Sequence, residues 1–365
     1  MGFSRWHNCC PKDKMPLEPT RLSSKTFWAV ACANVIQIVT YERNPNIFVC
    51  PKCSVQHGQI FWDIFKGGYR MSQQDLFLQI ISNGLALGSV YALISTGFSL
   101  IFNVLKFSNF SHGALMTLCA FIGYFTVARN GMGLAPTIAV AIAAGILVAL
   151  AGEFVAFRRI TQRQSSPVYF FVSSITLGTL YEGIVTIQVG ANYHNFPRFF
   201  ANPTFGIGSI VVSTSDAIMF VISAFALVVL ALLVQKTRMG RALRSVSFDR
   251  DTASLMGINV KRVIQFTFIL SGALAGLAGV FLGINYTLYP AMGSLVVKGF
   301  VASVIGGLGS LPGAIIGAML LGLVETLLIN AVGSGYSPIF VFLIMLVFLL
   351  VRPQGIAGSN VQEKA

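Results

Sequence analysis

Long, nearly uncharged apolar runs follow one another from residue 76 almost to the end of the chain. The runs are Leu76–Leu105, Gly113–Ala128, Ala135–Phe157, Val168–Gly190, Ala217–Val234, Val263–Asn285, Gly299–Ile329 and Tyr336–Val351. A helix needs about 20 apolar residues to cross the hydrocarbon core of a bilayer. Charged residues make up 10% of the chain, whereas soluble domains carry about 25%. We therefore predict an all-α polytopic membrane protein with about eight transmembrane helices.

The seventh run is too long for one spanning helix, and a cluster of glycines with Pro312 interrupts it between Gly306 and Gly313. Proline removes a helical hydrogen bond and glycine loosens a helix, so two broken or re-entrant segments should meet there. Irregular backbone at membrane depth must lie against protein or water. Gly306, Gly307 and Gly309 are therefore candidates for the lining of a translocation pathway.

Other glycines recur four residues apart within the apolar runs. The pairs are Gly84/Gly88, Gly272/Gly276 and Gly313/Gly317. Small residues at this spacing allow two helix backbones to approach closely in a membrane. We expect these pairs to mark helix crossings.

The distribution of Lys and Arg predicts how the chain is oriented in the membrane, because short cytoplasmic loops are rich in both. Arg158, Arg159 and Arg163 form one basic cluster, and residues 236–262 form a second. The opposite loops, 129–134 and 191–216, hold only Arg129 and Arg198. The two basic clusters should therefore face the cytoplasm, and counting back along the spans places residue 75 outside.

Residues 235–262 form a structured basic segment between two apolar runs. The segment carries seven basic side chains, Lys236, Arg238, Arg241, Arg244, Arg250, Lys261 and Arg262, and the acids Asp249 and Asp251. Its middle predicts a short helix, a turn at Met256-Gly257 and an exit into the next span. The net charge of +13 does not indicate nucleic acid, because the bases lie between spans and no aromatic-basic patch accompanies them. We interpret the segment as a docking surface for a cytoplasmic partner.

The sequence lacks the motifs that would make it an enzyme. It contains no Gly-x-x-x-x-Gly-Lys-Ser/Thr phosphate loop, no His-Glu-x-x-His and no Gly-x-Ser-x-Gly. ATP hydrolysis is therefore expected in partner subunits, and no cofactor is expected in this chain. Cys50-Pro-Lys-Cys53 with His57 lacks a second cysteine pair at zinc-finger spacing, so we expect no metal site.

A few polar side chains interrupt the apolar body. Asn109, Ser111 and His112 lie in a polar break between two runs, and Glu182 and Glu325 lie within runs. Ionisable residues inside a membrane are costly and are functional candidates by default. All five are candidates for the translocation pathway. The alternatives are that Ser111 simply caps the next helix, and that Glu182 packs against a partner helix.

Composition divides the chain into three parts. Residues 1–70 are mixed in composition, and we expect an N-terminal extension, with Met71 as the natural start of the product. Residues 71–357 should form the transmembrane permease domain, with a coupling segment at 236–262. Residues 358–365 should form a cytoplasmic tail.

Three ordered segments carry a family resemblance. They are Leu85-Ala-Leu-Gly-Ser-Val-Tyr-Ala-Leu-Ile-Ser-Thr-Gly-Phe-Ser-Leu-Ile-Phe-Asn-Val104 followed by Asn109-Phe-Ser-His-Gly113; Gly240-Arg-Ala-Leu-Arg244 with Ala253-Ser-Leu-Met-Gly-Ile-Asn-Val260; and Lys298-Gly-Phe-Val-Ala-Ser-Val-Ile-Gly-Gly-Leu-Gly-Ser-Leu-Pro-Gly-Ala-Ile-Ile-Gly317. Over residues 72–357 the chain resembles the permeases of branched-chain amino acid ABC importers, of the smaller LivH-like type. One departure concerns Ser111 and Ala114, where that family more often has alanine and an acid.

The resemblance implies a permease subunit of the bacterial inner membrane that works by alternating access. Its partners would be a second permease of the same family, two ATP-binding cassette subunits, and a periplasmic or lipid-anchored amino acid-binding protein. The ATPase-coupling residues would be Arg241, Arg244, Ala253, Ser254, Leu255, Met256, Gly257, Ile258 and Asn259. Membrane lipid surrounds such a subunit.

Two alternatives stay open. The same architecture serves permeases for urea or short amides, which form a closely related family. An ion-coupled secondary transporter would instead show charges at the midplane and inverted internal repeats, whereas only Glu182 and Glu325 lie there and no repeat is found.

Overall fold

The computed structural model describes residues 73–163, 166–197, 199, 204–207, 210–352 and 354–357. The expectations for residues 1–70 and for the tail at 358–365 lie outside the described residues. The helices are α3 (Gln73–Leu105), α4 (Ser111–Asn130), α5 (Leu134–Gly152), the π-helical turn η2 (Glu153–Phe157), α6 (Arg158–Gln162), α7 (Pro167–Val189), α8 (Thr214–Lys236), α9 (Arg238–Phe248), α10 (Arg250–Leu255), α11 (Val260–Asn285), the 3₁₀ helix η3 (Pro290–Leu295), α12 (Val296–Gly306), α13 (Leu311–Val332) and α14 (Ser337–Val351). Strands β1 (Thr204–Ile207) and β2 (Ile210–Ser213) pair as a small antiparallel hairpin.

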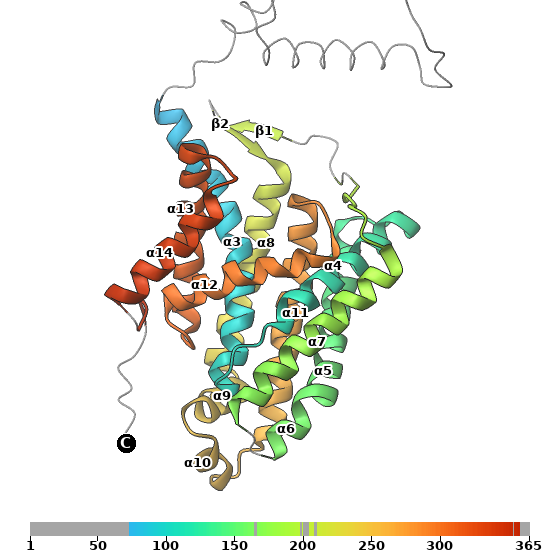
Figure 1. The fold of residues 1–365 in the computed structure, drawn as a ribbon, viewed down its shortest axis with the longest axis vertical. Helices are drawn as coiled ribbons and strands as arrows, with labels where there is room; N and C mark the ends of the chain where they lie inside the picture. The colour runs from blue at the N-terminus through green and yellow to red at the C-terminus, as the bar shows by residue number, and fades with distance from the viewer. Residues whose placement is uncertain are drawn as a thin grey trace, which may run out of the picture. The chain divides into compact units, whose positions relative to one another are not determined.

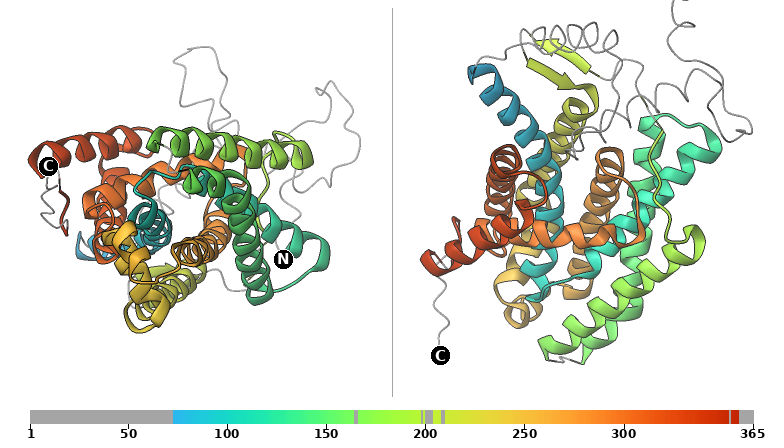
Figure 2. Two further views of the ribbon diagram at one scale, coloured as in Figure 1. Left: turned by 90° about the horizontal axis from the view of Figure 1, so that it is seen from below. Right: turned by 45° about the horizontal axis from the view of Figure 1, so that its top comes forward.

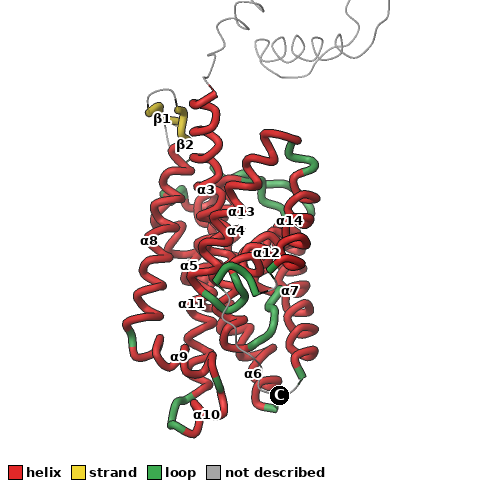
Figure 3. Tube along the Cα trace, turned by 90° about the vertical axis from the view of Figure 1, so that its left-hand side faces the viewer, coloured by secondary structure: helices red, strands yellow, loops and turns green. Residues whose placement is uncertain are grey.

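The described part of the chain contains seven helices that are long and apolar enough to cross a membrane. Two shorter apolar helical stretches, Pro290–Gly306 and Ser337–Val351, accompany them. Figure 1 shows the long helices as one bundle, and Figure 3 shows that helix dominates the trace. The prediction of an all-α polytopic protein with broken segments is confirmed.

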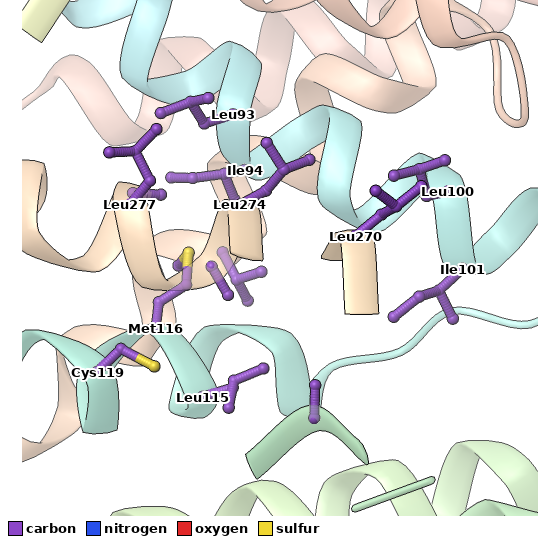
Figure 4. Close-up of a cluster of buried hydrophobic side chains, with 14 of the residues drawn as sticks. Leu93, Ile94, Leu100, Ile101, Leu115, Met116, Cys119, Leu270, Leu274 and Leu277 are labelled. Atoms are coloured by element: carbon purple, nitrogen blue, oxygen red, sulfur yellow. The ribbon is translucent and has the colours of Figure 1, made fainter. Parts of the chain in front are cut away.

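Helices α3 and α11 form the centre of the bundle. The most apolar window of each is 83% buried, whereas the corresponding windows of α5, α7, α8 and α13 are between 22% and 33% buried. Figure 4 shows side chains of α3, α4 and α11 converging in this core, among them Leu93, Met116 and Leu274. The outer helices present apolar side chains to their surroundings, as expected of a protein whose solvent is lipid.

The glycine pairs lie at helix crossings, as the sequence predicts. A Cβ atom on Gly272 or Gly276 of α11 would collide with the backbone of α5, at Gly145 and Ala141 respectively. A Cβ atom on Gly88 of α3 would lie against the Cα of Met319 in α13. Close backbone approach therefore holds α3 and α11 against their neighbours.

The seventh apolar run breaks between Gly306 and Leu311. Gly307 and Gly309 adopt φ angles of 107° and 87°, a region that favours glycine, and they turn the chain back on itself. The Ser310 hydroxyl then accepts a hydrogen bond from the Gly313 amide at 3.2 Å and caps α13. Helix α12 has 11 residues, or roughly 17 Å at 1.5 Å per residue, too short to cross the hydrocarbon core. Figure 1 shows α12 lying across the middle of the bundle, consistent with a re-entrant element.

Candidate functional site

Helices α9 and α10 project from one end of the bundle, between α8 and α11 (Figure 1). The corner between α8 and α9 is closed by Thr237, whose hydroxyl accepts a hydrogen bond from the Gly240 amide at 3.0 Å. Gly240 is required there, because a Cβ atom would collide with backbone carbonyl groups at the end of α8. The corner therefore fixes the angle at which α9 leaves the spanning helix.

Helix α10 is capped at its start by Asp249. One carboxylate oxygen accepts hydrogen bonds from the amides of Asp251 at 2.9 Å and Thr252 at 3.3 Å, and the other accepts from the Thr252 hydroxyl. These hydrogen bonds lower the pKa of Asp249, and the bond from the Thr252 side chain has the largest effect. The turn predicted at Met256-Gly257 is present, with Gly257 at a φ of 82°. The Asn259 side chain then caps α11 by accepting from the Arg262 amide at 3.2 Å.

A groove of about 590 Å³ lies on the surface of this segment, hereafter the coupling groove. Its lining residues are Arg241, Arg244, Ser245, Phe248, Asp249, Thr252, Ala253, Met256 and Ile258. Three apolar side chains at the groove or beside it are almost fully exposed, Phe248 at 87%, Leu255 at 87% and Met256 at 80%. Exposed apolar side chains gathered between basic residues are typical of a surface that binds another protein.

The predicted coupling residues divide into three groups. Arg241, Arg244, Ala253, Met256 and Ile258 line the coupling groove. Ser254 and Leu255 are exposed beside it. Gly257 and Asn259 shape the turn and the start of α11. Sequence reasoning missed Phe248, although a single aromatic residue within a polar, basic segment was the available signal.

Arg250 fastens α10 to the central helix α3. Its Nε donates to the carbonyl oxygen of Val104 at 2.9 Å, and a second guanidinium nitrogen donates to the same oxygen. Burial lowers the pKa of Arg250. Burial also lowers the pKa of Lys106, and the nearby positive charge of Arg250 lowers it further. The contact joins two segments 146 residues apart, so no local sequence pattern could predict it.

Asn109, Ser111 and His112 are buried where α3 gives way to α4. The Asn109 side-chain oxygen accepts hydrogen bonds from the Ser111 amide at 3.2 Å and from the Ser111 hydroxyl at 2.7 Å. The alternative that Ser111 caps the next helix is therefore wrong in detail. Ser111 is the first helical residue, and Asn109 supplies the acceptor because its side chain reaches forward past Phe110 to Ser111.

His112 ties this break to the bundle centre. One ring nitrogen, Nδ1, lies 3.2 Å from the Ser271 hydroxyl of α11, and that hydroxyl donates to the Gly97 carbonyl of α3 at 3.0 Å. The three break residues and Ser271 line one small enclosed pocket. The other pathway candidates do not line this pocket; they are Glu182, Glu325, Gly306, Gly307 and Gly309.

Glu325 of α13 forms an ion pair inside the bundle. Its Oε1 lies 2.5 Å from the Nζ of Lys298 in α12 and also accepts from the Ser337 hydroxyl of α14 at 3.4 Å. Lys298 donates a further hydrogen bond to the Tyr91 hydroxyl of α3 at 3.2 Å. Sequence reasoning missed Lys298, because it stands just before an apolar run and 27 residues from its partner.

The remaining pathway candidates lie elsewhere. Glu182 is half-buried on α7, and its backbone carbonyl accepts from the Thr186 hydroxyl at 2.8 Å. Gly306 and Gly307 are buried at the α12–α13 turn, and Gly309 beside them is half-buried. A Cβ atom on Gly306 would collide with the backbone of Gly313, so this turn is a tight helix crossing.

Comparison with known proteins gives matches along most of the chain. Residues 80–350 match the family described as branched-chain amino acid transport system / permease component. The high-affinity branched-chain amino acid transport system permease protein LivH of Escherichia coli (strain K12) is 33% identical over 80% of this chain and 100% of its own length. The permease protein BraD of Pseudomonas aeruginosa, from the system of the same description, is 32% identical over 79% of this chain and 98% of its own length. A solved structure titled an inward-facing conformation of a putative metal-chelate type ABC transporter aligns with a TM-score of 0.45 at 15% identity, over 90% of this chain and 100% of that one. A structural similarity that low supports no functional statement.

Proposed function

The chain belongs to the family of branched-chain amino acid transport system permease components, and from this we propose that it is the membrane-spanning subunit of an ATP-driven importer of branched-chain amino acids. It is a multi-pass ABC permease of the bacterial inner membrane. Its proposed partners are a second permease of the same family, two ATP-binding cassette subunits, and a periplasmic or lipid-anchored amino acid-binding protein. Substrate would cross by alternating access, driven by ATP hydrolysis in the cassette subunits.

The coupling groove is the observation that carries this proposal. Among the described apolar side chains outside the spanning helices, Phe248, Leu255 and Met256 are the most exposed. Full burial of one such side chain contributes about 1.5–3 kcal/mol. A cassette subunit seated on α9 and α10 would bury all three and would bring its own charges to Arg241 and Arg244.

The path from the groove into the membrane consists of specific contacts. Arg250 holds α10 to Val104 at the end of α3, and Asn259 begins α11 directly after the turn. A movement of the cassette subunits would therefore reach both central helices. Cassette subunits shift the equilibrium between two permease conformations only by binding them with different free energies.

The face formed by α7 and α14 is proposed to pack against the second permease. In Figure 2, seen from below, α7 and α14 lie along one edge of the bundle. Figure 3 places both on the side away from α8. A groove on α7 exposes small residues, Thr176, Thr179 and Gly183, and such residues favour close helix packing in membranes.

The roles proposed for the candidate pathway residues follow from this arrangement of two permeases. Glu182 lies on α7, which also forms this face, and the pathway would run between the two permeases. Asn109, Ser111 and His112 are enclosed in this structure, so they would reach a pathway only after α4 moves against α3. Glu325 and the turn at Gly306, Gly307 and Gly309 would move with the re-entrant hairpin.

The opposite end of the bundle is the proposed docking site for the binding protein. The β1–β2 hairpin lies there, and His194 pairs with Leu288 through backbone hydrogen bonds of 2.9 and 2.7 Å. These contacts hold the α7–α8 connection over the ends of α4 and α11, where Tyr124 approaches His194.

A photo-crosslinking amino acid at position 254, in the assembled transporter, tests the docking surface. We expect a crosslink to a cassette subunit from position 254 and none from Ser213, which lies at the other end of α8. The absence of a crosslink from every position between 248 and 257 would refute the docking role. Uptake of labelled leucine, isoleucine and valine in a deletion strain, with urea as the competing substrate, tests the transported class.

A further inference from the structure

A slot of about 500 Å³ opens between α8 and α13, and α3 forms its floor. Both walls are apolar, with Leu227, Leu230 and Ala231 from α8 and Leu311 and Ile315 from α13. Figure 1 shows these two helices flanking α3. Both are largely exposed in the bundle, with 28% of each most apolar window buried. The outer faces of α8 and α13 therefore meet the hydrocarbon of the membrane, and the slot opens between these two helices.

Apart from Thr96, the polar side chains of the slot gather at the end nearest the coupling segment. Asn103, Gln235, Arg244 and Ser310 line that mouth. Arg244 is held there by a hydrogen bond of 3.5 Å to the Gln235 carbonyl oxygen. Among the described residues that line the slot, Arg244 is the charged one and none is acidic.

The depth of the slot corresponds to one membrane leaflet. Leu227 and Gln235 lie eight positions apart on the same helix, which corresponds to about 12 Å along its axis. The hydrocarbon core is about 30 Å thick, so one leaflet contributes roughly 15 Å. A deep apolar slot of this length with a cationic mouth has the shape of a lipid, with its chain inside and its phosphate at the surface.

We propose that the slot binds an anionic phospholipid of the cytoplasmic leaflet, with one acyl chain between α8 and α13 and the phosphate at Arg244. Basic pockets between spanning helices on the cytoplasmic side select anionic headgroups. Lys236, Arg238 and Arg241 lie on the same α8–α9 corner and add to the positive potential. The buried Thr96 hydroxyl, which has no hydrogen-bond partner among the described residues, lies on the slot floor.

The lipid site would have a consequence for coupling, because Arg244 lines both the slot and the coupling groove. A bound phosphate would hold this side chain and the α8–α9 corner in place where a cassette subunit docks. The site rests on the proposed function in one respect, since it requires the coupling segment to face the cytoplasm.

Native mass spectrometry of the purified, assembled transporter tests the lipid site. The complex is titrated with phosphatidylglycerol and, separately, with phosphatidylcholine, in the absence of ATP and substrate. Ala231→Phe fills the slot, and Val228→Phe places the same side chain at a 57%-exposed position of α8 that does not line it. Arg244→Gln removes the charge at the mouth without filling the slot.

The native complex should bind one phosphatidylglycerol per permease at least ten-fold more tightly than phosphatidylcholine. Ala231→Phe should lose that lipid and Val228→Phe should retain it, while Arg244→Gln should lose most of the preference for phosphatidylglycerol. Unchanged phosphatidylglycerol binding in a folded Ala231→Phe complex would overturn the site, as would equal binding of both lipids by the native complex. If Ala231→Phe does not assemble, Arg244→Gln decides alone, because an unchanged lipid preference in that variant overturns the site. Crosslinking from position 254 reports on cassette docking separately, so the two ideas fail independently.

Discussion

Removing one charge of the Lys298–Glu325 pair should destabilise the protein far more than removing both. Lys298→Met leaves the Glu325 carboxylate buried among α12, α13 and α14, and Glu325→Gln leaves the Lys298 ammonium without its counter-ion. The double variant removes both charges, and the amide oxygen introduced by Glu325→Gln can still accept from the Ser337 hydroxyl. The three variants together with the native protein form a double-mutant cycle.

The magnitude follows from the geometry of the pair. The two atoms lie 2.5 Å apart, and at an effective dielectric constant of about 20 the attraction is roughly 6–7 kcal/mol before desolvation is subtracted. Breaking a buried pair by removing one partner typically costs about 3–5 kcal/mol, whereas replacing both is often nearly neutral. A loss of this size in a bundle of this length lowers the melting temperature by on the order of 10 °C.

Thermal unfolding of the purified protein in detergent, followed by static light scattering, measures each variant. Each single variant should melt on the order of 10 °C below the native protein, and the double variant should recover most of that loss. Additive losses in the double variant would refute the reasoning, because uncoupled residues cannot form a stabilising pair. Equal melting temperatures in all four proteins would refute it as well.

Three further predictions concern the coupling segment and the re-entrant turn. Arg250→Gln should retain ATP hydrolysis but lower amino acid uptake at least ten-fold, because α10 is no longer fastened to α3; unchanged uptake contradicts this role. Phe248→Ser should weaken cassette binding by roughly 1.5–3 kcal/mol, the value of one buried apolar side chain, with no change in the permease melting temperature. Gly313→Ala should cost about 1–3 kcal/mol through overpacking against α12, whereas Gly335→Ala, with open space around it, should not change the melting temperature.

The spans and the break were predictable because each depends on residues close together in sequence. Runs of about 20 apolar residues predict membrane crossings directly, and the cluster around Gly307 and Pro312 predicts a break within one run. The glycine pairs predicted crossings because four residues make about one helical turn. Their partners could not be predicted, since Gly272 meets α5 through a contact that no local pattern encodes.

The polar contacts within the bundle were not predictable for the same reason. Glu325 stood out as a carboxylate inside an apolar run, but its partner Lys298 and the contact to Tyr91 come from other helices. Arg250 resembled its basic neighbours in sequence, and only the fold separates it from them by burying it against Val104. Composition identifies such residues as candidates, and the packing of distant segments assigns their partners.

The contacts of α3 and α11 explain how a small surface segment could move a large bundle. Both helices touch the coupling segment at one end, α3 through Val104 and α11 through its direct continuation after Asn259. Deeper in the bundle the Ser271 hydroxyl bridges the Gly97 carbonyl and His112, and so joins α3, α4 and α11 again. Two helices joined at two heights and buried along most of their length cannot bend independently, so they must shift together. Helices α5 and α13 meet this central pair through close backbone crossings, Gly272 against Gly145 and Gly88 against Met319, so a shift of α3 and α11 would be passed directly to both.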